Sequence, residues 1–361
     1  MELNIGTVST IGLNSALVSS FYEKHWERKI ALTNSQFYDW QFKSTPSALE
    51  IDNCVIAYDA NIKKIIGVMG LNSRPFSLNN KWKSGAELTT WIVASEYQGL
   101  GVGPKILEYI QNSYDVLIGM GISSQALPVY MRKGFRYLRA IPRFIKIFDI
   151  DALNSVSIQT PLAKKLLKKW RQPETSSFVV REGVQDDYES LFNRTKKELN
   201  LFTRDTKHID WRYKNHPFFT YKTFTISTPD NKNIAFVCIR EETSVENLRI
   251  RHVLDYFGDY KAMPLALAFI EQYCDDKNFH AADFFCTAAT INKFLLSYGW
   301  FSGLDDECFQ LPHLYHPIEI RTPATTSLVY WTKENFVDFC DFSNLYITKQ
   351  DADFDRPILS I

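Results

Sequence analysis

The segment Leu88–Leu107, which reads LTTWIVASEYQGLGVGPKIL, constrains the fold more than any other part of this chain. Leu88–Val93 is rich in β-branched and aromatic residues, which is typical of a strand. Three glycines follow, and Pro104 then suits the first turn of a helix. The first N–H groups of a helix have no partner within it, and glycine lets a phosphate approach the backbone. The segment therefore predicts a strand, an anion-binding turn and a helix.

The spacing of the glycines distinguishes among anion-binding loops. Counted from Gly99, the third position is glycine but the sixth is Pro104, so a dinucleotide-binding fingerprint does not fit. No Gly-Lys-Ser/Thr follows, so a Walker-type loop does not fit either. The pattern Val-x-x-x-x-Gln-Gly-x-Gly-x-Gly, from Val93 to Gly103, resembles the acyl-CoA pyrophosphate loop of the GNAT acyltransferase superfamily. The resemblance implies that acyl-CoA contacts this loop and the strand before it, at Trp91, Ile92, Val93, Gln98, Gly99, Leu100, Gly101, Val102 and Gly103.

A second motif follows at residues 123–135, and it resembles the superfamily's Asn-x-x-Ala-x-x-x-Tyr-x-x-x-Gly-Phe helix. Ser123 stands where asparagine is usual, so it would bond the pantetheine arm with less reach, and Pro128 is expected to bend the first turn. The resemblance makes Tyr130 the candidate acid for the departing CoA thiolate, although a tyrosine that only packs in the core is the alternative. A free backbone N–H near Trp91 to Val93, where the strand is expected to splay, would bind the thioester oxygen.

The second half of the chain echoes the first. The segment DWQFKSTP at 39–46 recurs as DWRYKNHP at 210–217, a shift of 210 − 39 = 171 residues, and a hairpin pattern also returns, but the glycine loop does not. We therefore predict an α/β (α+β) fold with two tandem GNAT-like units, each a mixed central sheet flanked by helices. Residues 1–150 form the unit with the acyl-CoA site, closed by a strand at 144–150. Residues 151–177 form a linker helix and loop, and 178–361 a degenerate unit that shapes the acceptor site.

The composition limits the classes of partner. Lys+Arg and Asp+Glu are equal at 41 each, which gives no global attraction for nucleic acid or an anionic membrane. The six cysteines lie far apart, which argues against disulfides or structural zinc and fits a cytoplasmic protein with no metal. The N-terminus does not resemble a signal peptide, and no run reaches the roughly 18 apolar residues of a membrane span. The basic amphipathic stretch 161–171 is a linker helix or a weak membrane-surface contact.

The intact first unit, the segment WRYKNHP at 211–217 and the tail DADFDRP at 351–357 together resemble tandem-GNAT sugar N-acyltransferases. This resemblance covers most of the chain. Those enzymes of bacterial surface-polysaccharide (lipopolysaccharide and O-antigen) pathways move acetyl or 3-hydroxybutyryl from acyl-CoA to the amine of a dTDP-linked amino-deoxysugar. The resemblance implies direct attack in a ternary complex, with a nucleotide-sugar substrate. Trp40 and Arg212 are candidates for the nucleotide surface, and anchoring of each unit's core is the alternative.

Two other functions stay open. One is an aminoacyl transferase of cell-wall precursors that uses aminoacyl-tRNA, and the other is a non-catalytic acyl-CoA sensor. The general base is not identified by any pattern. His25, His208, His216 and His252 are candidates by residue type alone, each could equally be structural, and the acceptor amine could instead lose its proton to water.

Overall fold

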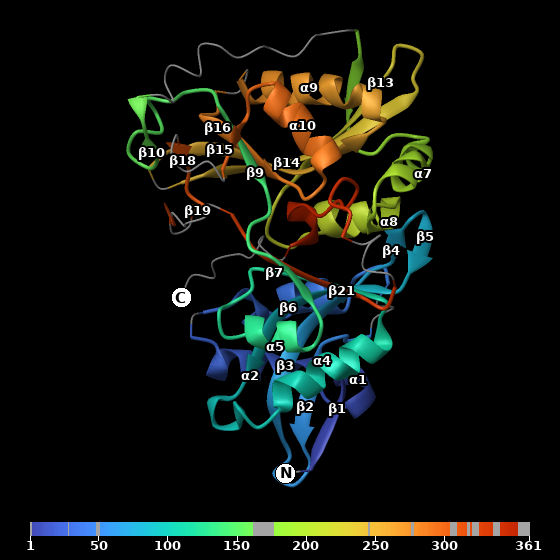
Figure 1. Cartoon of the computed structure of the whole chain (residues 1–361), viewed down its shortest axis with the longest axis vertical. Helices are drawn as coiled ribbons and strands as arrows, with labels where there is room; N and C mark the ends of the chain where they lie inside the picture. The colour runs from blue at the N-terminus through green and yellow to red at the C-terminus, as the bar shows by residue number, and fades with distance from the viewer. Residues whose placement is uncertain are drawn as a thin grey trace.

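The computed structural model describes residues 2–27, 29–47, 51–161, 177–244, 246–275, 278–303, 309–315, 318–319, 325–334 and 340–352. Two α/β bodies lie end to end along the long axis of the molecule, with the N-terminal half at the bottom of Figure 1 and most of the C-terminal half at the top. Each is built on a seven-stranded sheet of mixed direction. Two mixed sheets flanked by helices confirm the predicted fold class.

The first sheet has the order β1 (Leu3–Thr7), β2 (Val55–Asp59), β3 (Lys64–Ser73), β6 (Gly85–Val93), β7 (Val116–Met120), β21 (Leu328–Thr332), β8 (Arg136–Leu138). The second has the order β11 (Val179–Glu182), β13 (Lys222–Ser227), β14 (Asn233–Thr243), β15 (Arg249–Gly258), β16 (Ala281–Phe285), β9 (Arg143–Ile147), β17 (Phe301–Ser302). In both sheets the fourth and fifth strands are parallel and the other neighbours are antiparallel.

Smaller sheets lie beside these two. They are β12 (Leu201–Phe202), β4 (Phe76–Leu78) and β5 (Lys81–Lys83), then β10 (Ile158–Gln159) with β18 (Phe309–Gln310), and β19 (Leu314–Tyr315) with β20 (Ile318–Glu319). The basic helix expected at 161–171 falls almost wholly outside the described residues, as does the tail from 353 onward.

Helices cover both faces of the first sheet. Apolar side chains of α2 and α3 form one core with the sheet, and those of α4 and α5 form another. The helical segments of this half are α1 (Val8–Ile11), α2 (Ser15–His25), η1 (Ala31–Thr33), α3 (Ser35–Phe42), η2 (Ser95–Tyr97), α4 (Val102–Ser113) and α5 (Leu127–Arg132). Those of the second half are α7 (Tyr188–Glu198), α8 (Thr206–Ile209), η3 (Asp210–Lys214), η4 (Tyr260–Ala262), α9 (Met263–Asp275), α10 (Ala289–Ser297) and η5 (Lys349–Asp351).

The two sheets exchange their sixth strands. The prediction that a strand at 144–150 closes the first unit is wrong. The strand found there, β9, belongs to the second sheet, where it pairs with β16 and β17. In return, β21 from the C-terminal part lies between β7 and β8 of the first sheet. In Figure 1 the green β9 rises into the upper body while β21 lies in the lower one. Neither sheet is complete without residues from the other half.

The repeated Asp-Trp motif forms a contact between the halves. Trp40 on α3 and Trp211 on η3 stack with ring centroids 5.2 Å apart and planes 18° from parallel. The indole N–H of Trp40 donates to the carbonyl of Trp211 at 3.0 Å, and that of Trp211 donates to the carbonyl of Trp40 at 2.9 Å. Corresponding residues of the repeat therefore bond each other reciprocally, as across an approximate two-fold axis.

Candidate active site

The strands β6 and β7 diverge and leave a gap in the first sheet. They pair only from Gly85 to Leu88, although β6 continues to Val93 and keeps β3 as its other neighbour. Opposite Met69 and Gly70, Thr90 is an extra residue with φ of 44°, so β6 carries a bulge where the strands part. A positive φ is costly for a β-branched residue, on the order of 1–3 kcal/mol, which marks a position held by its surroundings. The hydroxyl of Tyr22 donates to the Thr90 carbonyl at 2.8 Å.

The backbone of β6 presents polar groups to this gap. The N–H of Ala94 donates to Ile66 on the β3 side, so in an antiparallel pair the N–H and carbonyl of Val93 point the other way, toward the gap. The carbonyl of Val93 accepts from the side-chain amide of Gln98 at 3.0 Å, which ties the glycine loop to the end of the strand. The Val93 N–H therefore faces the gap as a donor.

The predicted anion loop has the geometry that its glycines imply. Gly99 and Gly101 have φ of 79° and 81°, and Gly101 is the N-cap of α4 without a side-chain capping bond. Both glycines face open space, because a Cβ built on either would meet nothing within 4 Å. The first N–H groups of α4 therefore face an open site at the positive end of the helix dipole.

Gly103 serves a different purpose in the same turn. A Cβ there would lie 2.7 Å from the ring of Trp91, so its glycine lets α4 close onto the indole. Among the described residues, the Trp91 ring N–H is a buried donor that has no partner. Trp91 thus forms a wall between the loop and the strand gap.

Tyr130 reaches the same wall from α5. Its ring lies edge-on to Trp91 at 5.2 Å and to Phe135 at 4.9 Å, and only 3% of the residue is exposed. Within the described part of the chain, its hydroxyl makes no hydrogen bond. Burial raises the pKa of this phenol above its ordinary value, so it stays protonated and able to donate.

The bend expected at Pro128 is corrected by where this helix begins. The helix α5 starts at Leu127, so Pro128 lies in the first turn, where its missing N–H costs no helical bond and no bend is needed. Ser123 lies before the helix, and its hydroxyl accepts from the N–H of Ala126 at 3.2 Å. Ser123 is exposed and stabilises the turn that leads into α5, and its contact with a pantetheine arm stays a prediction.

The residues suggested for the nucleotide surface lie between the halves. Arg212 is only 3% exposed, and its guanidinium donates to the Gln350 carbonyl at 3.3 Å and to the Tyr221 hydroxyl at 3.0 Å. Trp40 is half-buried against Trp211. Their role in binding a nucleotide stays a prediction, and the contacts themselves join the halves.

The candidate histidines occupy different surroundings. His25 ends α2 and is half-buried against Phe21. Its pKa is lowered from the ordinary value by burial and by the charge of Lys24, and Glu96 of η2 opposes this shift only in part. The interaction with Glu96 places His25 near η2, the segment that precedes the glycine loop. The other three are buried and already bonded, His208 to Asp205 and Ser47, His216 to the N–H groups of Phe218 and Phe219, and His252 to Asp283 and Glu242.

The second sheet has a similar gap, but the side chain of Tyr346 lies in it. β15 runs to Gly258 yet pairs with β16 only from Ile250 to His252, and it too carries a bulge opposite β14. The hydroxyl of Tyr346 accepts from the Tyr256 N–H at 3.0 Å and lies 3.1 Å from the Tyr256 carbonyl. Tyr346 therefore occupies the backbone N–H and carbonyl of Tyr256 in this second gap.

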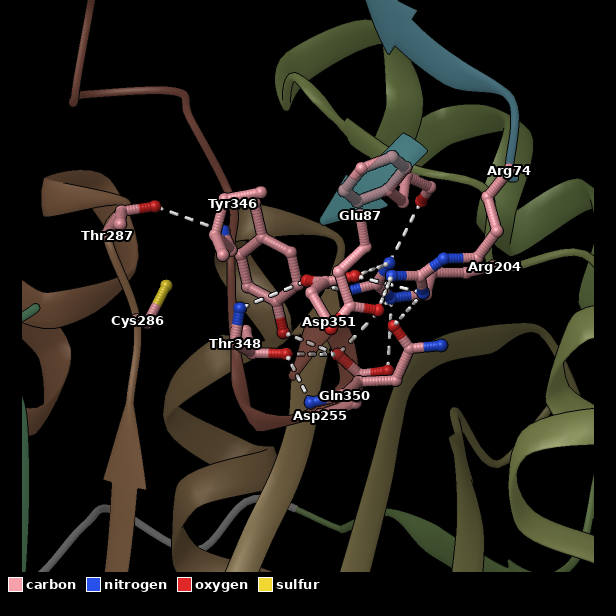
Figure 2. Close-up of polar contacts among 12 residues, drawn as sticks. Arg74, Glu87, Arg204, Asp255, Cys286, Thr287, Tyr346, Thr348, Gln350 and Asp351 are labelled. Carbon is pink, nitrogen blue, oxygen red and sulfur yellow. Dashed lines mark hydrogen bonds and ion pairs between the residues drawn. The ribbon is translucent and has the colours of Figure 1, made fainter. Parts of the chain in front are cut away.

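Charged residues that sequence reasoning missed join the two gaps in one buried network. Arg204 bonds Asp255 and Asp351, and Arg74 bonds Asp351 and Glu87 on β6. Figure 2 shows these side chains converging with Tyr346, Thr348 and Gln350. In a sequence such residues look like ordinary surface charges, so only their burial in the folded chain distinguishes them.

Two further findings concern the described residues alone. No helix among them is long and apolar enough to cross a membrane. They contain no group of three His, Cys, Asp or Glu side chains arranged to hold a metal ion.

Solved structures share this fold. The chain superposes on N-myristoyltransferase from Saccharomyces cerevisiae with bound myristoyl-CoA and inhibitors, with a TM-score of 0.51, 12% identity, and coverage of 92% of this chain and 80% of that one. It also matches a GCN5-related N-acetyltransferase from Anabaena variabilis, with a TM-score of 0.54, 12% identity, and coverage of 91% and 72%. A protein from Enterococcus faecalis described as a probable N-acyltransferase matches with a TM-score of 0.55 and 8% identity, and the match covers 91% of this chain and 72% of that one. No known sequence family and no curated protein sequence matches the chain. At these identities the likeness shows the fold alone, which this chain shares with these structures over nearly its whole length.

Proposed function

We propose that this protein is an acyl-CoA-dependent N-acyltransferase. The observation that carries the proposal is the gap between β6 and β7, which opens beside a glycine loop at the N-terminus of α4. The loop offers helix N–H groups to a pyrophosphate, and the gap leads from there toward Tyr130. The structures that share the fold include transferases with a bound acyl-CoA, which supports this assignment.

The reaction needs only direct attack within a ternary complex. A neutral amine attacks the thioester carbonyl, the new C–N bond forms, and the C–S bond breaks. The N–H of Val93 donates to the carbonyl oxygen as negative charge develops there. Tyr130 gives its proton to the departing CoA thiolate and is reprotonated from solvent, while the amine loses its proton to water or a nearby base.

The acceptor we propose is the amine of a dTDP-linked amino-deoxysugar, and the acyl group acetyl or 3-hydroxybutyryl. The repeated segment at 211–217 and the tail at 351–357 support this choice through their resemblance to sugar N-acyltransferases. Equal numbers of acidic and basic residues also suit a small nucleotide sugar better than tRNA. We place the enzyme in the cytoplasm, where such sugars and acyl-CoA meet.

The proposal is tested by assaying the purified chain with acetyl-CoA and 3-hydroxybutyryl-CoA. The acceptors are dTDP-6-deoxyhexoses that carry an amine at C3 or C4, and release of free thiol is measured together with the mass of the acylated sugar. Transfer to one of these amines supports the proposal. Transfer only to peptides or cell-wall precursors assigns a different acceptor, and tight CoA binding without any transfer identifies a sensor.

The loop itself is tested by Gly101→Glu, with Gly101→Asn as the matched control. A Cβ at this position meets nothing within 4 Å in either variant, but the carboxylate of glutamate places a negative charge where the pyrophosphate is proposed to bind. One lost charge-assisted hydrogen bond is worth roughly 1.5–3 kcal/mol, so we expect the Kd for CoA to rise by about 10-fold or more. Asparagine tolerates a positive φ and adds no charge, so its effect should be smaller. Calorimetry that finds Gly101→Glu binding CoA as tightly as the wild type contradicts the assignment of the loop.

A further inference from the structure

The bulge at Thr90 decides which side chains of β6 face the candidate active site. In a regular strand successive side chains point to opposite faces of the sheet, so residues an odd number of positions apart lie on opposite faces. Leu88 and Trp91 break this rule, because both pack into the core on the α4 side of the sheet. The extra residue Thr90 lies between them. The bulge therefore turns over the part of β6 that follows it.

The same bulge decides which way the backbone of β6 points. Before the bulge, the carbonyl of Gly85 accepts from the N–H of Arg74, which follows β3. In an antiparallel ladder every second residue bonds the same neighbour, so in a regular strand Val93, at 93 − 85 = 8 residues further on, would also bond the β3 side. With the bulge, the N–H of Ala94 bonds β3 instead and the Val93 N–H faces the gap.

The hydroxyl of Tyr22 supports this bulge from α2. The extra residue of a bulge drops out of the regular ladder pairing, and here the Tyr22 hydroxyl donates to the Thr90 carbonyl at 2.8 Å. Tyr22 is 0% exposed and packs in the core between α2, α3 and the sheet, so its hydroxyl bonds within the protein rather than to solvent. Thr90 has a φ of 44°, which β-branched residues avoid, so it adopts this conformation only with such support.

We propose that Tyr22 is a positioning residue for acyl transfer, because its bond to Thr90 fixes the register that aims the Val93 N–H at the thioester oxygen. This inference rests on the proposed acyltransferase function and deepens it. The same register sets the ring of Trp91 edge-on to Tyr130, the acid of the reaction. Tyr22 acts through the backbone of β6 and does not touch the reacting atoms.

The first test is Tyr22→Phe, which keeps the ring and removes only the hydroxyl. Deleting an oxyanion donor costs about 10²–10³ in kcat, and a donor that is only misplaced costs less. In the assay above, kcat should therefore fall about 10- to 100-fold. KM for acyl-CoA and the Kd for CoA should stay within about threefold, because the glycine loop is unchanged.

Tyr38→Phe is the matched control. Tyr38 on α3 lies in the same core, is 1% exposed and donates its hydroxyl to Asp52 at 2.9 Å rather than to β6. Both variants lose a buried hydrogen bond, so the midpoint of urea unfolding should fall in each, but Tyr38→Phe should keep kcat within about twofold. An unchanged kcat in Tyr22→Phe overturns the inference, and so does an equal loss of kcat in the two variants.

A second measurement does not depend on acyl transfer. The probe is an acetyl-CoA analogue in which a methylene replaces the sulfur, so that an unreactive ketone with an isotope-labelled carbonyl carbon takes the place of the thioester. A hydrogen bond lowers the stretching frequency of a carbonyl group. The bound ketone should therefore absorb at a lower infrared frequency in the wild type and in Tyr38→Phe than in Tyr22→Phe, and equal frequencies in all three proteins overturn the inference.

The same ketone gives a test that needs no variant. A crystal structure of the wild type with the analogue bound should place the ketone oxygen within hydrogen-bond distance of the Val93 N–H, and an oxygen bound elsewhere overturns the inference. If this bond and the frequency difference are found but no amine is ever acylated, the positioning role of Tyr22 stands and the proposed transferase function falls. If the wild type and Tyr22→Phe acylate an amine equally fast, the function stands and the positioning role falls.

Discussion

At the scale of single residues, Tyr130 shows how one atom is kept available. Its ring is fixed by Trp91 and Phe135, and its hydroxyl is not used by the fold. Tyr130→Phe should therefore keep the stability and the affinity for CoA. It removes a proton donor that matters most when charge develops on sulfur, so kcat should fall about 100-fold while KM changes little.

The pH dependence sharpens this prediction. Burial raises the pKa of the Tyr130 phenol, so the acid stays protonated beyond the ordinary tyrosine value of about 10. Deprotonation of Tyr130 should accordingly not lower the wild-type kcat at any pH up to 10. Turnover by Tyr130→Phe that matches the wild type at every pH would show that the tyrosine only packs and that water supplies the proton.

The glycine loop could be predicted at this scale because its information is local. The positive φ of Gly99 and Gly101 and the start of α4 follow from neighbouring residues alone. Glu87 and Arg74 could not be identified in this way, since the sequence does not reveal which charged side chains will be buried.

At the scale of elements, the same device appears twice with opposite outcomes. Both sheets separate their fourth and fifth strands, but only β6 is followed by a glycine loop, and only the second gap contains Tyr346. The missing loop could be predicted from the sequence. The position of Tyr346 in the second gap could not be predicted, because Tyr346 and Tyr256 are brought together by a long-range contact that no local pattern encodes.

This difference predicts one CoA per chain. Calorimetric titration should give a stoichiometry of one, and Tyr346→Phe should keep it at one because the second half still lacks helix N–H groups framed by glycines. The variant leaves the buried N–H of Tyr256 unpaired, so its free energy of unfolding should fall by about 1–3 kcal/mol. A wild-type stoichiometry of two contradicts this account of the second half.

At the scale of the whole molecule, the two halves are joined by exchange as well as by contact. β9 and β21 each complete the sheet of the other half, and the buried ion-pair network spans both. The repeat in the sequence indicated two similar units, yet the pairing of their strands depends on contacts between distant residues. The boundaries at 150 and 178 remain predictions, and the exchanged strands make independent folding of either half unfavourable. We therefore expect one cooperative unfolding transition rather than two.

The reciprocal pair of Trp40 and Trp211 provides the sharpest test of this coupling. Each indole N–H bonds the carbonyl of the other residue, so replacing one tryptophan with phenylalanine leaves a carbonyl unpaired and also weakens the stack. Each single variant should lose about 1–3 kcal/mol of unfolding free energy. Because the residues are in direct contact, Trp40→Phe with Trp211→Phe should cost less than the sum of the single changes, by at least about 0.5 kcal/mol.

Trp82→Phe is the matched control for this cycle, since Trp82 is 47% exposed on β5 and should change the unfolding free energy by less than about 0.5 kcal/mol. Urea unfolding followed by fluorescence and by circular dichroism measures all four variants. Coincident transitions with non-additive losses mean that the pair joins the halves into one folding unit. Strictly additive losses, or two separate transitions in the wild type, contradict that coupling and leave the exchanged strands and the buried ion-pair network as the connections to be tested.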